Sequence, residues 1–211
     1  LLDSLAKPGD KQLFISTHSS LVCSRLDLRK VVMMPTGNSL HDVDPDTADF
    51  FCKAPDNYVL EFAMSRRVIL VEGDAEFILI AAMYESATGS TLEKDGVHVI
   101  AVGGTSFKRY LSLAKILDVH TAVIRDNDGS YEKHCVENYE NLIGVHAQVF
   151  ADKDDKRSTF EICLYEDNKA LCDKLFGVGR RTLTPLEWML SNKAEAALSL
   201  LKHHEGELKV P

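Results

Sequence analysis

Residues 68–77 read VILVEGDAEF, and this stretch decides how the rest of the chain is interpreted. Its four leading apolar residues form a continuous run, which is typical of a strand covered on both faces of a parallel sheet. The run ends on Glu72, and the apolar pattern that follows predicts a helix over residues 74–87. Gly73 stands at the junction, where the absence of a side chain permits a sharp turn and leaves room for a ligand.

Strands and helices continue to alternate beyond this stretch. Such alternation predicts βαβ units with right-handed crossovers and a parallel sheet. In the helical C-terminal third, Thr184 and Glu187 form an expected capping box around Pro185, and a second box is expected at residues 192–195. The expected strands are 68–71, 97–102, 121–124 and 146–150, and the expected helices are 74–87, 106–117, 159–175 and 194–204.

The region before residue 66 has a different character. Residues 12–17 and 31–34 have the composition of short strands. The segment between Pro35 and Pro55 is rich in Asp, Asn, Gly and His, which predicts a loop or linker that contains a short helix over residues 46–54. Residues 57–66 predict a further helix that leads into the strand at 68–71.

Composition limits the class of protein. The 211 residues suffice for one domain, or for one domain and part of another. No apolar run approaches the roughly 20 residues that a membrane span needs, and the start lacks the layout of a signal peptide. Five scattered cysteines without CxxC spacing predict reduced thiols in a cytoplasmic protein. The net charge of −8 argues against a general polyanion binder, although an acidic pocket for divalent cations gives the same signature.

Carboxylates follow two of the expected strands. Glu72 ends the first strand, and Asp126 and Asp128 follow the strand at 121–124. Ligands of open parallel sheets bind in a crevice at the carboxyl ends of the strands. Glu76 lies in the first turn of the helix that follows the first strand, so we expect it to face the same crevice. Four acids in one place repel one another unless a cation compensates, and such oxygen ligands suit Mg²⁺ or Mn²⁺.

Each of these signals has a plainer interpretation when it is taken alone. A glutamate in the first helical turn, such as Glu76, complements the helix dipole without any further role. The run Asp126-Asn127-Asp128-Gly129 is also a common turn sequence. Acids at corresponding ends of two strands in one βαβαβ unit are a stronger indication of a metal site than either signal alone.

The pattern VEGDAE after one strand and a DxD pair after a later strand resembles the Toprim fold. The longer first motif with Glu76 resembles that of the OLD (overcoming lysogenization defect) nucleases in particular. STFE at residues 158–161 resembles their middle motif, and SNKAEAAL at residues 191–198 resembles their late motif with a lysine, here Lys193. The resemblance implies a Rossmann-like α/β parallel-sheet domain with added C-terminal helices.

The segment QLFISTHSSLV, at residues 12–22, resembles the last strand and switch histidine of the ABC-type ATPase domain that precedes Toprim in that family, with His18 as the histidine. No GxxxxGK[ST] motif occurs, so ATP binding by this chain is not expected. The resemblance implies a C-terminal piece of a longer ATPase–nuclease, with the missing ATPase domain as a partner and a route to homo-oligomers. It divides the chain into an ATPase remnant at 1–40, a linker at 41–65 and a Toprim nuclease domain at 66–211.

The function implied by the resemblance is divalent-metal-dependent hydrolysis of DNA phosphodiesters, with two ions roughly 3.5–4 Å apart. Asp126 and Asp128 would hold one ion and Glu72 and Glu76 the other, unless Glu72 acts as general base. Ser158 and Glu161 would complete the coordination, and Lys193 would face the phosphate. For Glu161 and Lys193, a solvated surface charge is the plainer alternative. Expected DNA-backbone contacts, each of which also suits an ordinary surface charge, are Lys108, Arg109, Lys156, Arg157, Arg180 and Arg181.

Two other functions compete with this one. IRDNDGS also resembles the haloacid-dehalogenase motif, in which Asp126 would be a covalent nucleophile of a phosphatase and Asp128 the acid. That family places the motif on its first strand, whereas here two strands precede it, and Glu72 is left without a role. The other alternative is a non-catalytic Toprim domain that only binds partners, for which the loss of one acid would be expected.

Overall fold

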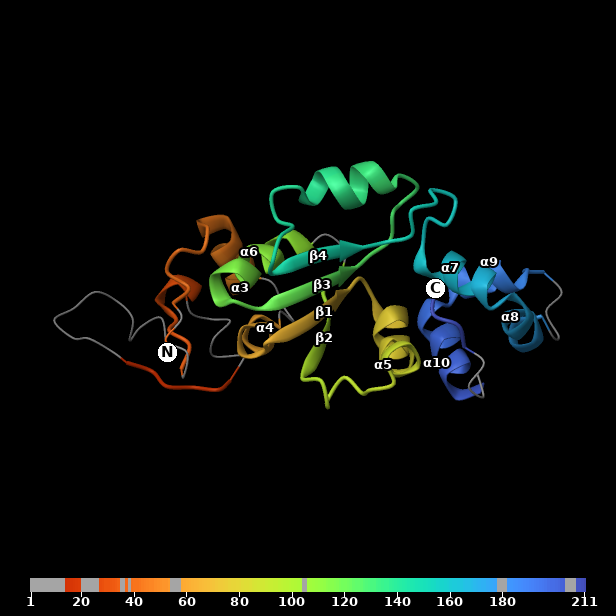
Figure 1. The fold of residues 1–211 in the computed structure, drawn as a ribbon, viewed down its shortest axis with the longest axis horizontal. Helices are drawn as coiled ribbons and strands as arrows, with labels where there is room; N and C mark the ends of the chain where they lie inside the picture. The colour runs from red at the N-terminus through yellow and green to blue at the C-terminus, as the bar shows by residue number, and fades with distance from the viewer. Residues whose placement is uncertain are drawn as a thin grey trace.

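The structure is a computed structural model, and it describes residues 14–19, 27–34, 37, 39–53, 58–103, 106–177, 182–203 and 208–211. A sheet occupies the centre of the molecule, with one group of helices toward the amino ends of the strands and another beyond their carboxyl ends (Figure 1).

The sheet consists of four parallel strands in the order β2-β1-β3-β4. The strands are β1 (Arg67–Val71), β2 (Val97–Ala101), β3 (His120–Ile124) and β4 (Ala147–Phe150). The predicted α/β parallel-sheet fold is confirmed. From β1 the chain proceeds outward to β2 and then returns to β3 on the other side of β1, so the strand order reverses between β1 and β3.

One core lies between the sheet and the group of helices toward the amino ends of the strands. Side chains of β1 such as Leu70 pack there with Phe107 and Leu111. Phe51 and Phe62 meet the ring of Tyr110 edge-on, which fastens the two short upstream helices to the sheet. The helices of this core are α3 (Pro45–Lys53), α4 (Val59–Met64) and α6 (Phe107–Leu117), close to their predicted bounds.

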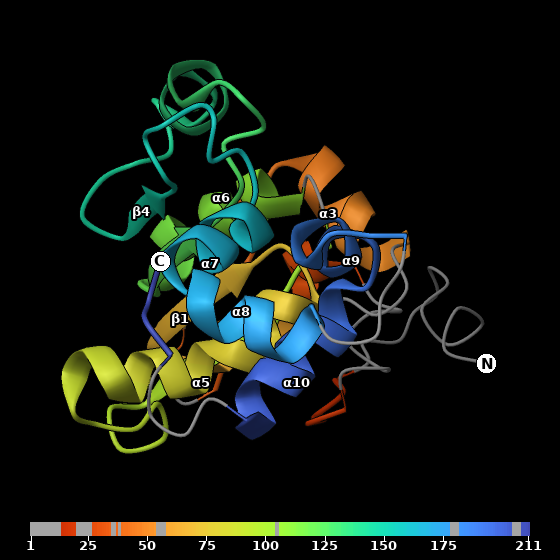
Figure 2. The same ribbon diagram turned by 90° about the vertical axis from the view of Figure 1, so that its right-hand side faces the viewer.

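A second core joins α5 (Asp74–Thr88) to the C-terminal helices. Leu79 and Met83 of α5 pack with Leu200, and α10 runs beside α5 in the view of Figure 2. Phe176 stacks on Trp188 with ring centroids 4.8 Å apart. The C-terminal helices are α7 (Phe160–Asp167), α8 (Lys169–Phe176), α9 (Pro185–Ser191) and α10 (Lys193–His203).

Two expectations for the C-terminal third are wrong in detail. The single helix expected at 159–175 breaks at Asn168, because the side chain of Asn168 donates to the carbonyls of Leu164 and Lys209 and accepts from the Lys209 N–H. The capping box of Thr184 and Glu187 is confirmed. Asn192 does not provide the second box, since its side-chain amide donates to Trp188 O at the end of α9.

The strands expected upstream are also wrong where the structure describes them. Residues 14–17 belong to no strand, and Phe14 is 84% exposed, so its ring is not packed against the described part of the chain. Within 31–34, Val32 forms a single antiparallel bridge with Ser39 instead of a ladder. His18 is exposed. The assignment of residues 1–40 to an ATPase remnant stays a prediction, as do the other domain boundaries.

Smaller features complete the described part of the chain. A 3₁₀ turn occupies η1 (Leu28–Lys30), and the connection from β3 to β4 contains a π-helical turn, η3 (Glu132–Val136), and a 3₁₀ turn, η4 (Glu137–Tyr139). The cysteines within the described ranges are free thiols, as expected, and Cys23 lies outside those ranges. None of the helices described is long and apolar enough to cross a lipid bilayer.

Candidate active site

The predicted acids meet at the carboxyl edge of β1 and β3. This is the switch point of the sheet, where crossovers leave in opposite directions and an open crevice remains. Glu72 directly follows β1, and Asp126 lies two residues after β3. The Asp126 N–H lies 3.3 Å from Glu72 Oε1 and donates a hydrogen bond to it, so the two strand ends are linked through the acids themselves.

The turn from β1 into α5 places Glu76 beside Glu72. The backbone of Gly73 is extended, with φ −148°, and other residues adopt this conformation equally well. The predicted need for glycine at a sharp turn is therefore wrong. A Cβ at Gly73 would lie 3.5 Å from Glu76 Oε2, in ordinary contact with a carboxylate that is only 6% exposed.

A pocket of about 360 Å³ opens above these acids. Glu72, Glu76 and Asp126 line one side, and Lys193 at the start of α10 lines the other. Because α10 packs along α5, Lys193 of the late motif lies near Glu72 and Glu76 of the first motif. The remaining lining residues are Gly73, Asp74, Ala75 and Ala194.

Glu161 is the deepest acid of the site. It lies in the first turn of α7 and is 2% exposed, so the alternative of a solvated surface acid is wrong for this residue. Lys193 Nζ lies 2.9 Å from Glu161 Oε2, yet both carboxylate oxygens are buried without a hydrogen bond of good geometry. Among the described residues, Glu161 is therefore compensated by its ion pair with Lys193 and by no hydrogen bond of good geometry, and such a buried charge is costly.

Burial and mutual repulsion alter the acidity of this cluster. The pKa of Glu72 is raised to about 7. Burial is the largest cause, the nearby charge of Asp126 adds to the rise, and Arg125 opposes it by a smaller amount. Burial likewise raises the pKa of Asp126 to about 6, although the N–H of Phe160, 2.7 Å from Asp126 Oδ1, opposes the change. The pKa of Glu76 is also raised, mainly by burial. Burial is thus the main cause of the raised pKa values of all three acids, and the repulsion between neighbouring carboxylates adds to it.

Lys193 responds in the opposite sense to its surroundings. Burial alone would lower the pKa of this ammonium, but the close contact with the Glu161 carboxylate and the charges of Asp126 and Glu76 raise it. Lys193 therefore remains a cation at the rim of the pocket, where half of its side chain stays exposed.

Asp128 and Ser158 lie beside the pocket without lining it. Asp128 has φ 51°, and its carboxylate is 52% exposed and accepts from Arg125 Nη2 at 2.7 Å. Its N–H donates to Ser158 O at 3.2 Å, which joins the DxD turn to the middle motif through the backbone. The acids thus share one edge of the sheet, but no three of their ligand atoms lie within 4.8 Å of one another; among the residues described, the only such group is Asp118, His120 and His146.

Residues 64–128 match the OLD-like TOPRIM domain. The matching family model is described as the overcoming lysogenization defect protein-like TOPRIM domain. The matched segment begins at the last residue of α4 and ends at Asp128, so it contains three strands of the sheet and the acids Glu72, Glu76 and Asp126. The resemblance expected from the VEG and DxD motifs is confirmed for this part of the chain.

Individual proteins also resemble this chain. Endonuclease GajA from Bacillus cereus (strain VD045) is 28% identical over 141 residues, which are 64% of this chain and 24% of GajA. The chain therefore spans about a quarter of the length of that relative. The solved C-terminal region of the Burkholderia pseudomallei OLD protein is 20% identical, with a TM-score of 0.47 over 69% of this chain and 85% of its own. The corresponding region from Xanthomonas campestris pv. campestris is 22% identical, with a TM-score of 0.47 over 71% and 89%.

Two residues beside the strand-end acids were not singled out from the sequence. Arg125, 11% exposed, lies 3.6 Å from Glu72 Oε1 through Nε and also contacts Asp128, so it supplies a cation inside the acid cluster. Asn127 is 1% exposed; its side chain donates to the carbonyls of Asp152 and Asp154 and accepts from Gly129 N–H. An arginine next to a strand-end acid, and an asparagine inside a DxD pair, are the signals that mark them.

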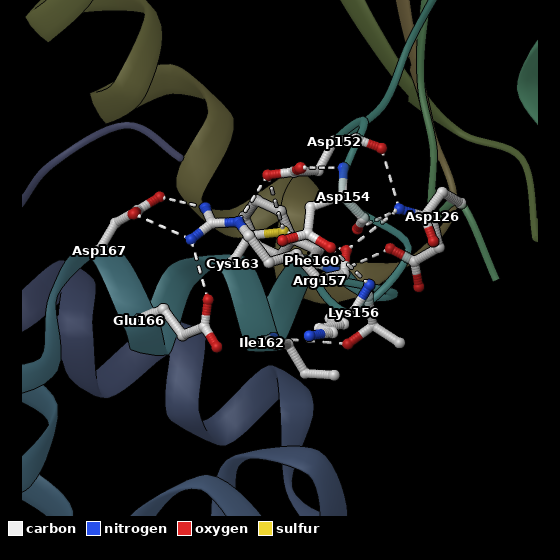
Figure 3. Close-up of polar contacts among 12 residues, drawn as sticks. Asp126, Asp152, Asp154, Lys156, Arg157, Phe160, Ile162, Cys163, Glu166 and Asp167 are labelled. Atoms are coloured by element: carbon white, nitrogen blue, oxygen red, sulfur yellow. Dashed lines mark hydrogen bonds and ion pairs between the residues drawn. The ribbon is translucent and has the colours of Figure 1, made fainter. Parts of the chain in front are cut away.

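The predicted DNA contacts that the structure describes have different local surroundings. Arg157 lies at the centre of a cluster of acids, where its guanidinium contacts Asp152, Glu166 and Asp167 (Figure 3). That arrangement suits a structural role, because its donors are already occupied. The others are Lys108, over the ring of Tyr139; Arg109, over Phe50; Lys156, exposed beside Asp154; and Arg180 and Arg181, outside the described residues.

Proposed function

We propose that the chain is the catalytic part of a divalent-metal-dependent DNA endonuclease. The observation that carries the proposal is the pocket in which Glu72, Glu76 and Asp126 face Lys193 at the switch point of the sheet. Raised pKa values in such a cleft mark residues that are poised for chemistry or for a cation.

The chemistry of the donor set fits Mg²⁺ or Mn²⁺. The site offers carboxylate oxygens and no sulfur or imidazole, which is the preference of these hard cations. The two buried oxygens of Glu161 lack hydrogen bonds, and a cation would satisfy them. The raised pKa values of Glu72 and Asp126 indicate the same deficit, because a cation would lower both.

We assign Asp126 and Asp128 to one ion and Glu72 and Glu76 to a second, with Ser158 and Glu161 completing their surroundings. When bound, such ions polarise a phosphodiester and lower the pKa of water. The assignment requires the Asp128 carboxylate to leave Arg125, with which it pairs in this structure. Side-chain rotation of an exposed residue allows this change without movement of the sheet.

The residues of the chain then supply positioning, charge and proton transfer. As the alternative to binding an ion, Glu72 would accept a proton from an attacking water. In the ion-free chain its pKa is about 7, and a general base works best when its pKa lies near the operating pH. Lys193 places a point cation at the pocket rim, where it stabilises the charge that develops on the phosphate. The N–H of Phe160 fixes the orientation of Asp126.

The relatives support the choice of reaction. GajA bears the name endonuclease, and the match to the OLD-like TOPRIM domain covers the segment that contains the strand-end acids. On this basis we also propose DNA as the substrate, an ATPase domain elsewhere in a longer protein as the partner, and assembly into homo-oligomers through that domain.

Plasmid cleavage tests the proposal. The full chain is incubated with supercoiled DNA and Mn²⁺ or Mg²⁺, with a chelator as control, beside the variants Glu72→Gln and Asp126→Asn and the matched control Glu85→Gln, an exposed acid at the far end of α5. The wild type and Glu85→Gln should nick the plasmid, and the two site variants should not.

Two results would contradict this function. Equal nicking by all four proteins would remove the site assignment. Hydrolysis of a small phosphomonoester, with covalent trapping of beryllofluoride on Asp126 and no plasmid cleavage, would instead support the phosphatase.

A further inference from the structure

A second cluster of potential metal ligands lies at the opposite edge of the sheet. His120 is the first residue of β3, His146 directly precedes β4, and Asp118 is the C-cap of α6. Three segments that are separate in the sequence meet there because β3 and β4 pair in parallel. From His120 to Asp126 the chain is extended over six residues, so this cluster lies on the order of 15–20 Å from the acids.

The geometry of the cluster is close to that of a metal site. One ligand atom from each side chain lies within 4.8 Å of those of the other two. Asp118 Oδ1 and His146 Nδ1 are already 3.2 Å apart. Ligand bonds of about 2.0–2.1 Å place neighbouring ligands of a tetrahedral ion about 3.3–3.4 Å apart, so this pair needs almost no movement. The imidazole rings of His120 and His146 lie with centroids 5.6 Å apart, and small rotations bring in the third ligand.

The nitrogen of His146 lacks another use. Nδ1 is buried and makes no hydrogen bond within the described part of the chain, and its approach to Asp118 lacks the geometry of one. A buried imidazole nitrogen without a partner is unfavourable unless something accepts its lone pair or its proton. Asp118 adopts φ 58° as the left-handed C-cap of α6, a conformation in which aspartate is enriched among residues other than glycine, and the chain continues from it to His120.

The backbone beneath the cluster is well fixed. The N–H of Thr121 donates to His146 O at 2.8 Å, and the N–H of His120 donates to Arg66 O at 2.9 Å. The N–H of Val119 donates to Ala114 O, which closes the end of α6. The three side chains are therefore held on a rigid base, and the ion does not need to organise the loops around them.

We propose that Asp118, His120 and His146 bind a transition-metal ion of the Zn²⁺ class. Two imidazole nitrogens and one carboxylate are ligands that Zn²⁺, Ni²⁺ and Co²⁺ accept and that Mg²⁺ disfavours. The site differs in both chemistry and position from the all-oxygen acid site, and it does not depend on the nuclease function. An ion there ties the end of α6 to the starts of β3 and β4.

Calorimetric titration of the full chain with Zn²⁺, in excess Mg²⁺ to occupy the acid site, tests the proposal. The wild type should bind one Zn²⁺ at this cluster. His120→Ala and His146→Ala should each weaken binding by at least about tenfold, which is the loss that follows even from removing an outer partner of a metal ligand. His98→Ala, an exposed histidine of β2, is the matched control and should bind Zn²⁺ like the wild type. Asp118→Asn, whose side chain is 77% exposed, provides a variant that does not disturb packing.

A variant of the acid site shows which of the two sites binds the Zn²⁺ ion. Glu72→Gln should retain Zn²⁺ affinity, because it changes only the acid site. Absence of Zn²⁺ binding by the wild type would overturn the proposal, as would equal binding by His120→Ala, His146→Ala and wild type. Loss of the Zn²⁺ signal in Glu72→Gln would assign the ion to the acids and would equally overturn it.

Discussion

Replacing Glu72 by glutamine should make the metal-free chain more stable while it removes activity. Glutamine has nearly the same shape, and its side-chain oxygen still accepts the N–H of Asp126. The substitution removes only a carboxylate that is buried and faces Asp126. Stability and activity should therefore move in opposite directions, which a purely structural glutamate would not produce.

The size of the gain follows from the pKa of Glu72. The difference between about 7 in the folded chain and the ordinary value of 4.5 corresponds to about 3 kcal/mol. Because the folded-state pKa is raised, the folded chain binds the proton more tightly, so this stability is present below pH 4.5 and is lost as the pH rises through about 7. Above that pH, Glu72→Gln should be more stable than the wild type by about 3 kcal/mol, on the order of 10 °C in Tm.

Denaturant unfolding in the presence of a chelator measures this effect. Stabilities of wild type, Glu72→Gln and the control Glu85→Gln are compared below pH 4.5 and above pH 7. We expect the wild type and Glu72→Gln to be similar in acid and to diverge above neutrality, with Glu85→Gln following the wild type. Mn²⁺ should then stabilise the wild type more than Glu72→Gln. A wild type that is as stable as Glu72→Gln above pH 7, or a gap that does not depend on pH, would refute the reasoning.

Three further substitutions address the rest of the site and its support. Lys193→Ala should lower plasmid nicking by about a hundredfold while calorimetry still shows Mn²⁺ binding; lost binding would mean that Lys193 is structural. Arg157→Met leaves its carboxylate partners unpaired and should lower the unfolding free energy by about 1–3 kcal/mol in urea. Weaker DNA binding with unchanged stability would instead support Arg157 as a DNA contact. Thr184→Ala removes the cap of α9 and should cost about 1 kcal/mol in the same assay; no change in stability would contradict the role of the capping box.

Local patterns in the sequence predict most of the sheet and the helices around it. The apolar run at 68–71 and the helical spacing that follows are local signals, and the structure places β1 and α5 there. The break at Asn168 was not predictable in this way, because it depends on hydrogen bonds with Lys209, far along the chain. The strand expected at 12–17 is not formed over residues 14–17, the part that the structure describes, for a related reason: strand composition alone is a weak signal without a pairing strand, and none pairs with these residues in the described part of the chain.

The candidate site was also predictable only in part from the sequence. The acids were predictable because each follows a recognisable strand, and the parallel order then brings Glu72 and Asp126 together. The pairing of Asp128 with Arg125 was not predictable, because both side chains come from one short turn whose conformation is set by Asn127. The cluster of His120 and His146 was also invisible in the sequence, because only the pairing of β3 with β4 creates it.

Arg125 affects the charge that a nucleic acid would meet at this site. Glu72, Glu76, Asp126, Asp128 and Glu161 carry five negative charges when they are ionised, Asp74 in the pocket lining carries a sixth, and Arg125 and Lys193 carry two positive ones. The residues alone therefore total four negative charges and repel a phosphodiester. Two divalent ions would cancel this total and remove the repulsion. DNA affinity at the pocket and divalent-ion affinity should therefore be thermodynamically linked, each raising the other by the same factor.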